Sequence, residues 1–339
     1  MKSTRCLMLA VAIVAAPLLS LPTRTHAQDG GFYRGKTITI VVGYSAGGGY
    51  DQYARLLARH FGRHIPGNPS IVVQNMPGAA SFTAVRYLSA AGPKDGTAIA
   101  MFDPGLILES LSAPDRFNVK FSDYQWVGGM SREVTFCYAW HATGIKSWND
   151  MMGRKEFLLG LTAKGSAVYA NAAALRRIFN APIRQIAGYP GSNEQRLALE
   201  RGEIEGLCAS WSAIPQDWIA NNKIAPLARF APQRPADMPH TPYVNDLATT
   251  PEQRDVLNIL NAPGQLGRPF IAAKEAPRER VQVLASALAE TLKDPALLAD
   301  AKKQSLAIEL FSAEESEKIV NTVYSASPDL VRRFKAVYD

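Results

Sequence analysis

The three glycines at residues 47–49 are the part of the sequence best suited to binding chemistry. They follow an apolar run typical of a buried strand and precede residues 51–65, whose apolar spacing is typical of a helix. Glycine lets the backbone approach a ligand closely, and the start of a helix offers unpaired N–H groups to an anion. The segment therefore predicts an anion-binding loop, with a tight turn that binds nothing as the alternative.

The glycine loop does not match the nucleotide-binding patterns, since GxGxxG needs glycine at Gln52 and the Walker A pattern needs lysine at Gly49. Residues 43–47 do spell GxSxG, the nucleophile elbow of α/β-hydrolases, with Ser45 as the nucleophile. The elbow requires earlier strands and an upstream oxyanion loop, for which the short stretch before the strand leaves no room. This context argues against the elbow, so we expect no catalytic residue. A secreted serine hydrolase that uses Ser45 is kept as the alternative.

Histidines and cysteines give weaker signals. His60 and His64 have helical i, i+4 spacing, but Phe61 replaces the glutamate of HExxH, so we expect solvated histidines. Cys137 and Cys208 lie in apolar, strand-like runs, where a disulfide is one interpretation and two buried free thiols are the favoured one. Without a CxxC pattern or a Cys/His cluster, we expect no metal and no cofactor.

Three further loops, at 75–81, 162–166 and 188–193, also join a predicted strand to a predicted helix. The carboxyl ends of parallel strands meet at one edge of a sheet, where open α/β sheets bind ligands. Lys164 is the only cation in these loops. We expect it to pair with a second anionic group of the ligand, and the alternative is an exposed surface lysine.

The rest of the chain alternates strand-like and helix-like runs, which predicts an α/β fold with parallel sheets. The predicted strands are 36–43, 70–74, 97–102, 134–140, 157–162, 184–187, 204–209, 224–230 and 268–272. Predicted helices cover 51–65, 81–91 and 192–202, and others begin near Gly165, Pro277 and Ser312. The spacings of Ser192 with Gln195 and of Ser312 with Glu315 predict capping boxes.

Length and composition fit a secreted globular protein of about two domains, since 339 residues are 47% hydrophobic and 20% charged. Residues 1–27 predict a signal peptide, with Lys2 and Arg5 before an apolar run and a small-x-small end at Ala27; an uncleaved anchor is the alternative. Cleavage after Ala27 lowers the formal net charge from +7 to +4. The sequence has no basic stripe interleaved with aromatic residues, so we expect no nucleic-acid partner.

Six short motifs, taken in order, resemble the periplasmic substrate-binding proteins of tripartite tricarboxylate transporters, also called Bug receptors. They are AGGGYD at 46–51 for a PGGG-x-D loop, NMPGA at 75–79 for N-x-PGA, GPKDGT at 92–97 for an APxDG turn, GS at 165–166, YPGS at 189–192 for YKGS, and GEIE at 202–205 for GE-I/V-D. The sequence departs from the family pattern at GYSAGGG, usually PFPPGGG, at Lys164, usually glycine, at Tyr169, near a usual histidine, and at Pro190, often lysine.

The resemblance implies a two-lobed, type II-like Venus flytrap fold, with lobe 1 formed by 28–131 and 235–339 and lobe 2 by 132–234. It implies a monomeric periplasmic receptor that holds a small organic carboxylate between the lobes and delivers it to membrane transporter subunits. A periplasmic sensor for a two-component kinase, with the same fold and ligand, is an alternative. The implied ligand-binding residues are Tyr44, Ser45, Gly47, Gly48, Gly49, Asn75, Gly78, Ala79 and Ser81 in lobe 1, and Lys164, Gly165, Ser166, Tyr189, Ser192 and Trp211 in lobe 2.

Overall fold

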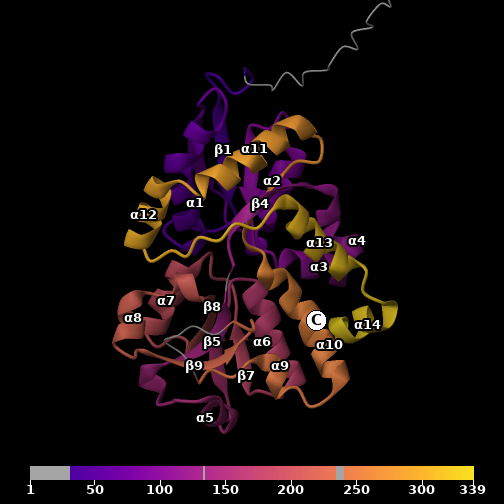
Figure 1. Cartoon of the computed structure of the whole chain (residues 1–339). Coiled ribbons are helices and arrows are strands. Elements are labelled where there is room, and N and C mark those ends of the chain that lie inside the picture. Colours follow the sequence, from indigo (N-terminus) through magenta and orange to yellow (C-terminus); the bar gives the residue numbers. More distant parts are fainter. Residues whose placement is uncertain (1–30, 133, 234–239) are drawn as a thin grey trace, which may run out of the picture.

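The computed structural model describes residues 31–132, 134–233 and 240–339, which form two lobes around two five-stranded sheets (Figure 1). The predicted signal peptide, residues 1–27, lies outside the described residues. Within the described ranges, no helix is both long enough and apolar enough to cross a membrane. We call the part around the first sheet the first lobe and the part around the second sheet the second lobe.

The first sheet has the strand order β2-β1-β3-β10-β4. Its strands are β1 (Thr37–Val42), β2 (Ser70–Asn75), β3 (Ala98–Met101), β4 (Gln125–Ser131) and β10 (Gly267–Ala272). Strand β1 runs parallel to β2 and β3, whereas β10 is antiparallel to β3 and β4. The β-branched sequence TITIVV places β1 inside the sheet, where its last three residues are buried.

The second sheet has the order β7-β6-β8-β5-β9. Its strands are β5 (Thr135–Trp140), β6 (Phe157–Gly160), β7 (Ile183–Ile186), β8 (Gly206–Ser210) and β9 (Ile224–Arg229). Strand β6 is parallel to β7 and β8, and β5 is antiparallel to β8 and β9. Both sheets are therefore mixed, with one strand in each running against its neighbours.

Helices surround both sheets (Figure 1). Those of the first lobe are α1 (Gly49–Phe61), α2 (Phe82–Ala90), α3 (Leu106–Ser112), α4 (Pro114–Phe117), α11 (Arg278–Thr291), α12 (Pro295–Lys303) and α13 (Ala313–Tyr324). Those of the second are α5 (Trp148–Met152), α6 (Ala167–Ile178), α7 (Ser192–Glu200), α8 (Gln216–Ala220), α9 (Val244–Leu247) and α10 (Pro251–Asn261). Helix α14 (Pro328–Tyr338) contacts α3 of the first lobe and α6 and α10 of the second.

The α/β fold class is confirmed, and each predicted strand corresponds to a strand of the structure. The prediction of parallel sheets is wrong for β5 and β10, because strand–helix alternation does not reveal the direction in which a strand enters a sheet. Strand β4 was not predicted. The capping box at Ser312 is confirmed, whereas that at Ser192 is wrong, since α7 begins after Gly191 without a side-chain cap.

The predicted division at residues 131/132 and 234/235 stays a prediction, because residue 133 and residues 234–239 lie outside the described residues. After that gap, α10 packs against α6, so the chain remains beside the second sheet as far as Asn261. It then returns to the first sheet as β10.

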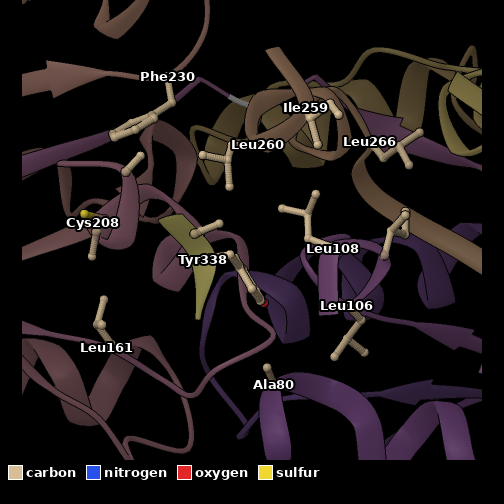
Figure 2. Packing of buried hydrophobic residues seen from close by; sticks show 14 of the residues in the cluster. Ala80, Leu106, Leu108, Leu161, Cys208, Phe230, Ile259, Leu260, Leu266 and Tyr338 are labelled. Atoms are coloured by element: carbon tan, nitrogen blue, oxygen red, sulfur yellow. The ribbon is translucent and has the colours of Figure 1, made fainter. Parts of the chain in front are cut away.

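One apolar cluster runs through both lobes (Figure 2). Tyr338 of α14 lies between Leu108 and Ala80 of the first lobe and Cys208 of the second. All four are buried, with at most 4% of each side chain exposed. Because apolar area withdrawn from water stabilises a contact, this cluster joins the lobes on the side of the molecule where α14 lies.

Cys137 and Cys208 form a disulfide, so the prediction of two free thiols is wrong. The two residues are direct partners in the antiparallel pairing of β5 with β8. An apolar strand context is equally suited to a thiol and to a cystine, and the pairing register, which the sequence does not reveal, decides between them.

Removal of the disulfide with Cys137→Ser and Cys208→Ser is expected to lower the free energy of unfolding by roughly 4 kcal/mol, because the bond closes a long loop in the unfolded chain. The loop spans a sequence separation of 71 residues. Urea unfolding of the oxidised protein and of the double variant measures the difference. A reductant should destabilise only the wild type, and equal effects on both proteins would contradict the assignment.

Candidate functional site

The predicted glycine loop of the first lobe touches the predicted loop 188–193 of the second. The Ser45 amide donates to the Pro190 carbonyl at 3.3 Å, and the Asn193 side chain donates to the Ala46 carbonyl at 3.0 Å. The Ser45 hydroxyl donates to the Glu194 carboxylate at 3.0 Å. The two lobes are therefore closed on each other at these loops.

A cavity of about 80 Å³ lies between the lobes beside these contacts. It is lined by Tyr44, Gly48, Gly49, Tyr50, Asp103 and Arg268 from the first lobe and by Thr135, Thr162, Ala167, Val168, Ser192, Gln195, Cys208, Ala209, Ser210 and Ala213 from the second. Because both lobes supply walls, a molecule in the cavity would contact both and would favour the closed arrangement.

Three helices begin at this cavity: α1 at Gly49, α6 at Ala167 and α7 at Ser192. The residues before α1 and α7 are Gly48 and Gly191, and neither helix has a side-chain cap. The first amides of a helix lack partners within it and carry positive potential. The helix starts thus give the cavity an environment suited to an anion.

Arg268 of β10 places a guanidinium in the same cavity. The residue is 3% exposed, and its guanidinium carbon lies 4.3 Å from the centre of the Tyr50 ring and 5.0 Å from that of Tyr53. Its φ of +55° is in the left-handed region, which non-glycine residues rarely adopt outside functional or strained positions. A Cβ atom added to Gly49 would lie 3.0 Å from Arg268 Nη2, so the cation sits at the start of α1.

Asp103 of the first lobe places a buried carboxylate against the second lobe. Its Oδ1 accepts from the amides of Gly105 at 2.8 Å and of Ala167 at 2.9 Å, and its Oδ2 accepts from the Tyr44 hydroxyl at 2.6 Å. Burial raises the pKa of Asp103, and the hydrogen bonds from Tyr44 and the two amides act in the opposite direction. Burial and the neighbouring Asp103 charge also raise the pKa of Tyr44 well above its ordinary value, so Tyr44 keeps its proton and donates it.

Gln195 adds a further polar group from the second lobe. It is 5% exposed, and among the described residues its side-chain Nε2 has no hydrogen-bond partner. A buried amide nitrogen without a partner is unfavourable, and a ligand oxygen in the cavity would satisfy it.

Asp51, in the first turn of α1, fixes the shape of the glycine loop. Its Oδ2 accepts from the Gly47 amide and from Arg55 Nε, both at 2.8 Å, and its Oδ1 accepts from Asn75 Nδ2 at 2.9 Å. Burial acts to raise the pKa of Asp51, but the hydrogen bonds from Arg55, Gly47 and Asn75 outweigh it and leave the pKa below its ordinary value. Gly47, at φ +77°, has the left-handed backbone that the turn requires.

The structure brings Tyr44, Gly48, Gly49 and Ser192 together around the cavity, as the sequence predicted. Two other predicted residues, Asn75 and Ser81, lie outside the lining and hydrogen-bond the backbone of residues that line the cavity. Asn75 donates to the Tyr44 carbonyl at 3.0 Å, and the Ser81 hydroxyl, expected to cap α2, instead accepts from the Asp103 amide at 3.2 Å. Ser45 and Gly47 belong to the contact between the lobes.

The remaining predicted residues do not line the cavity. Gly78 and Ala79 are exposed, Gly165 is buried against Leu106, and Ser166 caps α6. Tyr189 and Trp211 are half-buried and pack against the apolar core of the second lobe, as a structural tryptophan would. His60, expected to be solvated, is 6% exposed and lies 3.1 Å from Asp300.

Lys164 also lies outside the cavity lining. Its Nζ is 2.7 Å from the Asp339 carboxylate and 5.5 Å from the centre of the Tyr338 ring. The cation that lines the cavity is Arg268, which is not among the residues predicted from the sequence. Asp103 is not among the predicted residues, although it lies two residues after the end of β3, and ligands bind at such strand ends in open α/β sheets.

Solved structures that share this fold include several periplasmic binding proteins. The periplasmic binding protein BugD is 18% identical, with 90% of this chain and 98% of that chain covered and a TM-score of 0.72. MatC of Rhodopseudomonas palustris, solved with bound malate, is 16% identical over 90% of this chain and 99% of that chain, with a TM-score of 0.69. A second protein of that organism, solved with adipate, is 19% identical over 88% and 97%, with a TM-score of 0.67.

The chain therefore has the two-lobed fold of periplasmic binding proteins, as predicted. The structures it is similar to include BugD, a protein of the kind that the sequence motifs resemble. Because the identities are below 20%, this similarity concerns the fold alone. No family model and no curated protein matches the sequence.

The Asp51 network makes a pH-dependent prediction. A carboxylate whose pKa is lower in the folded protein stabilises it above the unfolded pKa, and this stabilisation is lost as the pH falls through the folded pKa. Asp51→Asn is expected to reduce the free energy of unfolding by roughly 1–3 kcal/mol at neutral pH. Urea unfolding should show that the difference from the wild type shrinks in acid, and a difference that grows in acid would contradict the role of Asp51.

Proposed function

We propose that this protein is a periplasmic receptor that binds a small organic carboxylate between its lobes and delivers it to a tripartite tricarboxylate-type membrane transporter. The observation that carries the proposal is the position of Arg268, which lies at the start of α1 in a cavity that also receives the starts of α6 and α7. Arg268 and the start of α1 come from the first lobe, whereas the start of α7 comes from the second, so an anion between them would hold the lobes together.

The chemistry of the cavity suits a carboxylate in particular. A guanidinium binds a carboxylate through two parallel N–H···O bonds, and the first amides of α1 and α7 would stabilise the same charge. Gln195 Nε2, which has no hydrogen-bond partner in the described part of the chain, supplies a further donor. The two similar proteins solved with malate and with adipate hold organic acids, which supports the same ligand class for this chain.

Binding, as opposed to catalysis, fits the surroundings of Ser45. A serine hydrolase needs a histidine to take the proton of the serine hydroxyl. In this structure the Ser45 hydroxyl donates to Glu194, a contact that joins the two lobes. The predicted signal peptide and the similarity to periplasmic binding proteins support export, and closure around a ligand gives a transporter a shape to recognise.

The ligand class is tested by thermal unfolding with a panel of organic acids and the amide of each acid. A ligand that binds only the folded protein stabilises it by about 2.7 kcal/mol at a hundredfold excess over Kd. For a chain of this size that is a rise in melting temperature of roughly 5–10 °C. Acids should raise the temperature and their amides should not. Equal rises with amides would contradict the proposal, as would chemical conversion of a bound acid.

Arg268→Gln should weaken binding of the best acid by roughly 2–5 kcal/mol in calorimetry, because the ligand charge would lose its ionic partner. Lys164→Ala is the matched control, since this cation pairs with Asp339 outside the cavity. Melting of each variant without ligand checks its folding. Loss of binding in Lys164→Ala with none in Arg268→Gln would restore the assignment made from the sequence.

The transport role is separated from signalling in cells that lack the protein. Loss of uptake of the labelled acid supports delivery to a transporter. Normal uptake together with a lost transcriptional response to the acid would favour the sensor alternative.

A further inference from the structure

The charges around the cavity are few and fixed in place. Of the described residues that line it, Arg268 and Asp103 are the ones with side chains normally charged at neutral pH. The positive charge is at the start of α1, and the negative charge is at the start of α6. A ligand that binds at Arg268 therefore has a protein carboxylate elsewhere in the same cavity.

Asp103 already takes the position that a second ligand carboxylate would need. Its Oδ1 accepts from the amide of Ala167, the first residue of α6, at 2.9 Å. Its Oδ2 accepts from Tyr44 at 2.6 Å. Every one of these partners is a donor, which matches an ionised carboxylate. The anion-binding start of α6 is thus occupied by the protein itself.

We propose that Asp103 is a specificity-determining residue that makes this receptor select short monocarboxylates over dicarboxylates. The inference rests on the proposed function and names the substrate class of the same site. The cavity has a volume of about 80 Å³, and both Arg268 and Asp103 line it. Two ligand charges cannot be far apart in that space, so a second carboxylate would lie close to Asp103, where like charges repel strongly because little water screens them.

Lys164 does not offset this repulsion. It was the expected partner of a second carboxylate, but its Nζ lies 2.7 Å from Asp339 and outside the cavity lining. Among the described residues that line the cavity, Arg268 is the one cation, and its charge acts to lower the pKa of the neighbouring Asp103. The remaining polar groups, such as Gln195, suit a neutral end of the ligand.

The test compares malonate with malonamate, which differ only in that an amide replaces one carboxylate, together with propionate. Calorimetry is performed at a pH where both malonate carboxyl groups are ionised. The wild type should bind malonamate or propionate about tenfold or more tightly than malonate, because like charges in one binding site are strongly unfavourable. Asp103→Asn keeps the shape of the side chain and removes its charge, so the preference should fall by about tenfold or more.

Glu194→Gln is the matched control, because Glu194 also places a carboxylate across the lobes but does not line the cavity. Its preference between the two acids should equal that of the wild type. Malonate binding as tight as malonamate binding in the wild type, or an unchanged preference in Asp103→Asn, would overturn the inference while the carboxylate receptor stands. The wild-type comparison decides the matter even if Asp103→Asn fails to fold. Absence of binding by all acids of both this set and the wider panel would overturn the proposed function as well.

Discussion

The physical constraint at the centre of the closed site is the hydrogen bond between Asp103 and the first amide of α6. It joins a carboxylate at the end of β3 in the first lobe to a helix start in the second. Burial makes such a charged contact sensitive to its surroundings, and Tyr44, Gly105 and Ser81 complete the hydrogen bonding of Asp103. The same side chain therefore joins the two lobes and gives the cavity its negative charge.

Arg268 illustrates how the fold keeps a cation buried in the same cavity as that carboxylate. Its left-handed backbone directs the residue out of the regular course of β10, and the rings of Tyr50 and Tyr53 lie within cation–π distance of the guanidinium. The aromatic rings come from α1, whose first residues also form the glycine loop. Strand β10 reaches this position only because it inserts between β3 and β4, far from both in the sequence.

The parts of the site that were predicted correctly are those that leave a local signal. A glycine run between an apolar strand and an amphipathic helix predicts the loop at Gly48 and Gly49, and both residues line the cavity. Arg268 leaves no such signal, because neither its left-handed φ nor the insertion of β10 is visible in neighbouring residues. The direction of β5, and with it the pairing of Cys137 with Cys208, depends on the same kind of long-range contact. The charge and loop position of Lys164 predict a ligand contact. Lys164 instead pairs with Asp339, which is distant in the sequence, and does not line the cavity.

A crystal structure with a bound acid tests the central claim most directly. The account predicts electron density for the acid between the lobes, with its carboxylate against the Arg268 guanidinium and the first amides of α1, and with the second lobe closed over it at Ser192 and Gln195. An acid bound on an outer face, or one in the cavity whose charged group points away from Arg268, would contradict it.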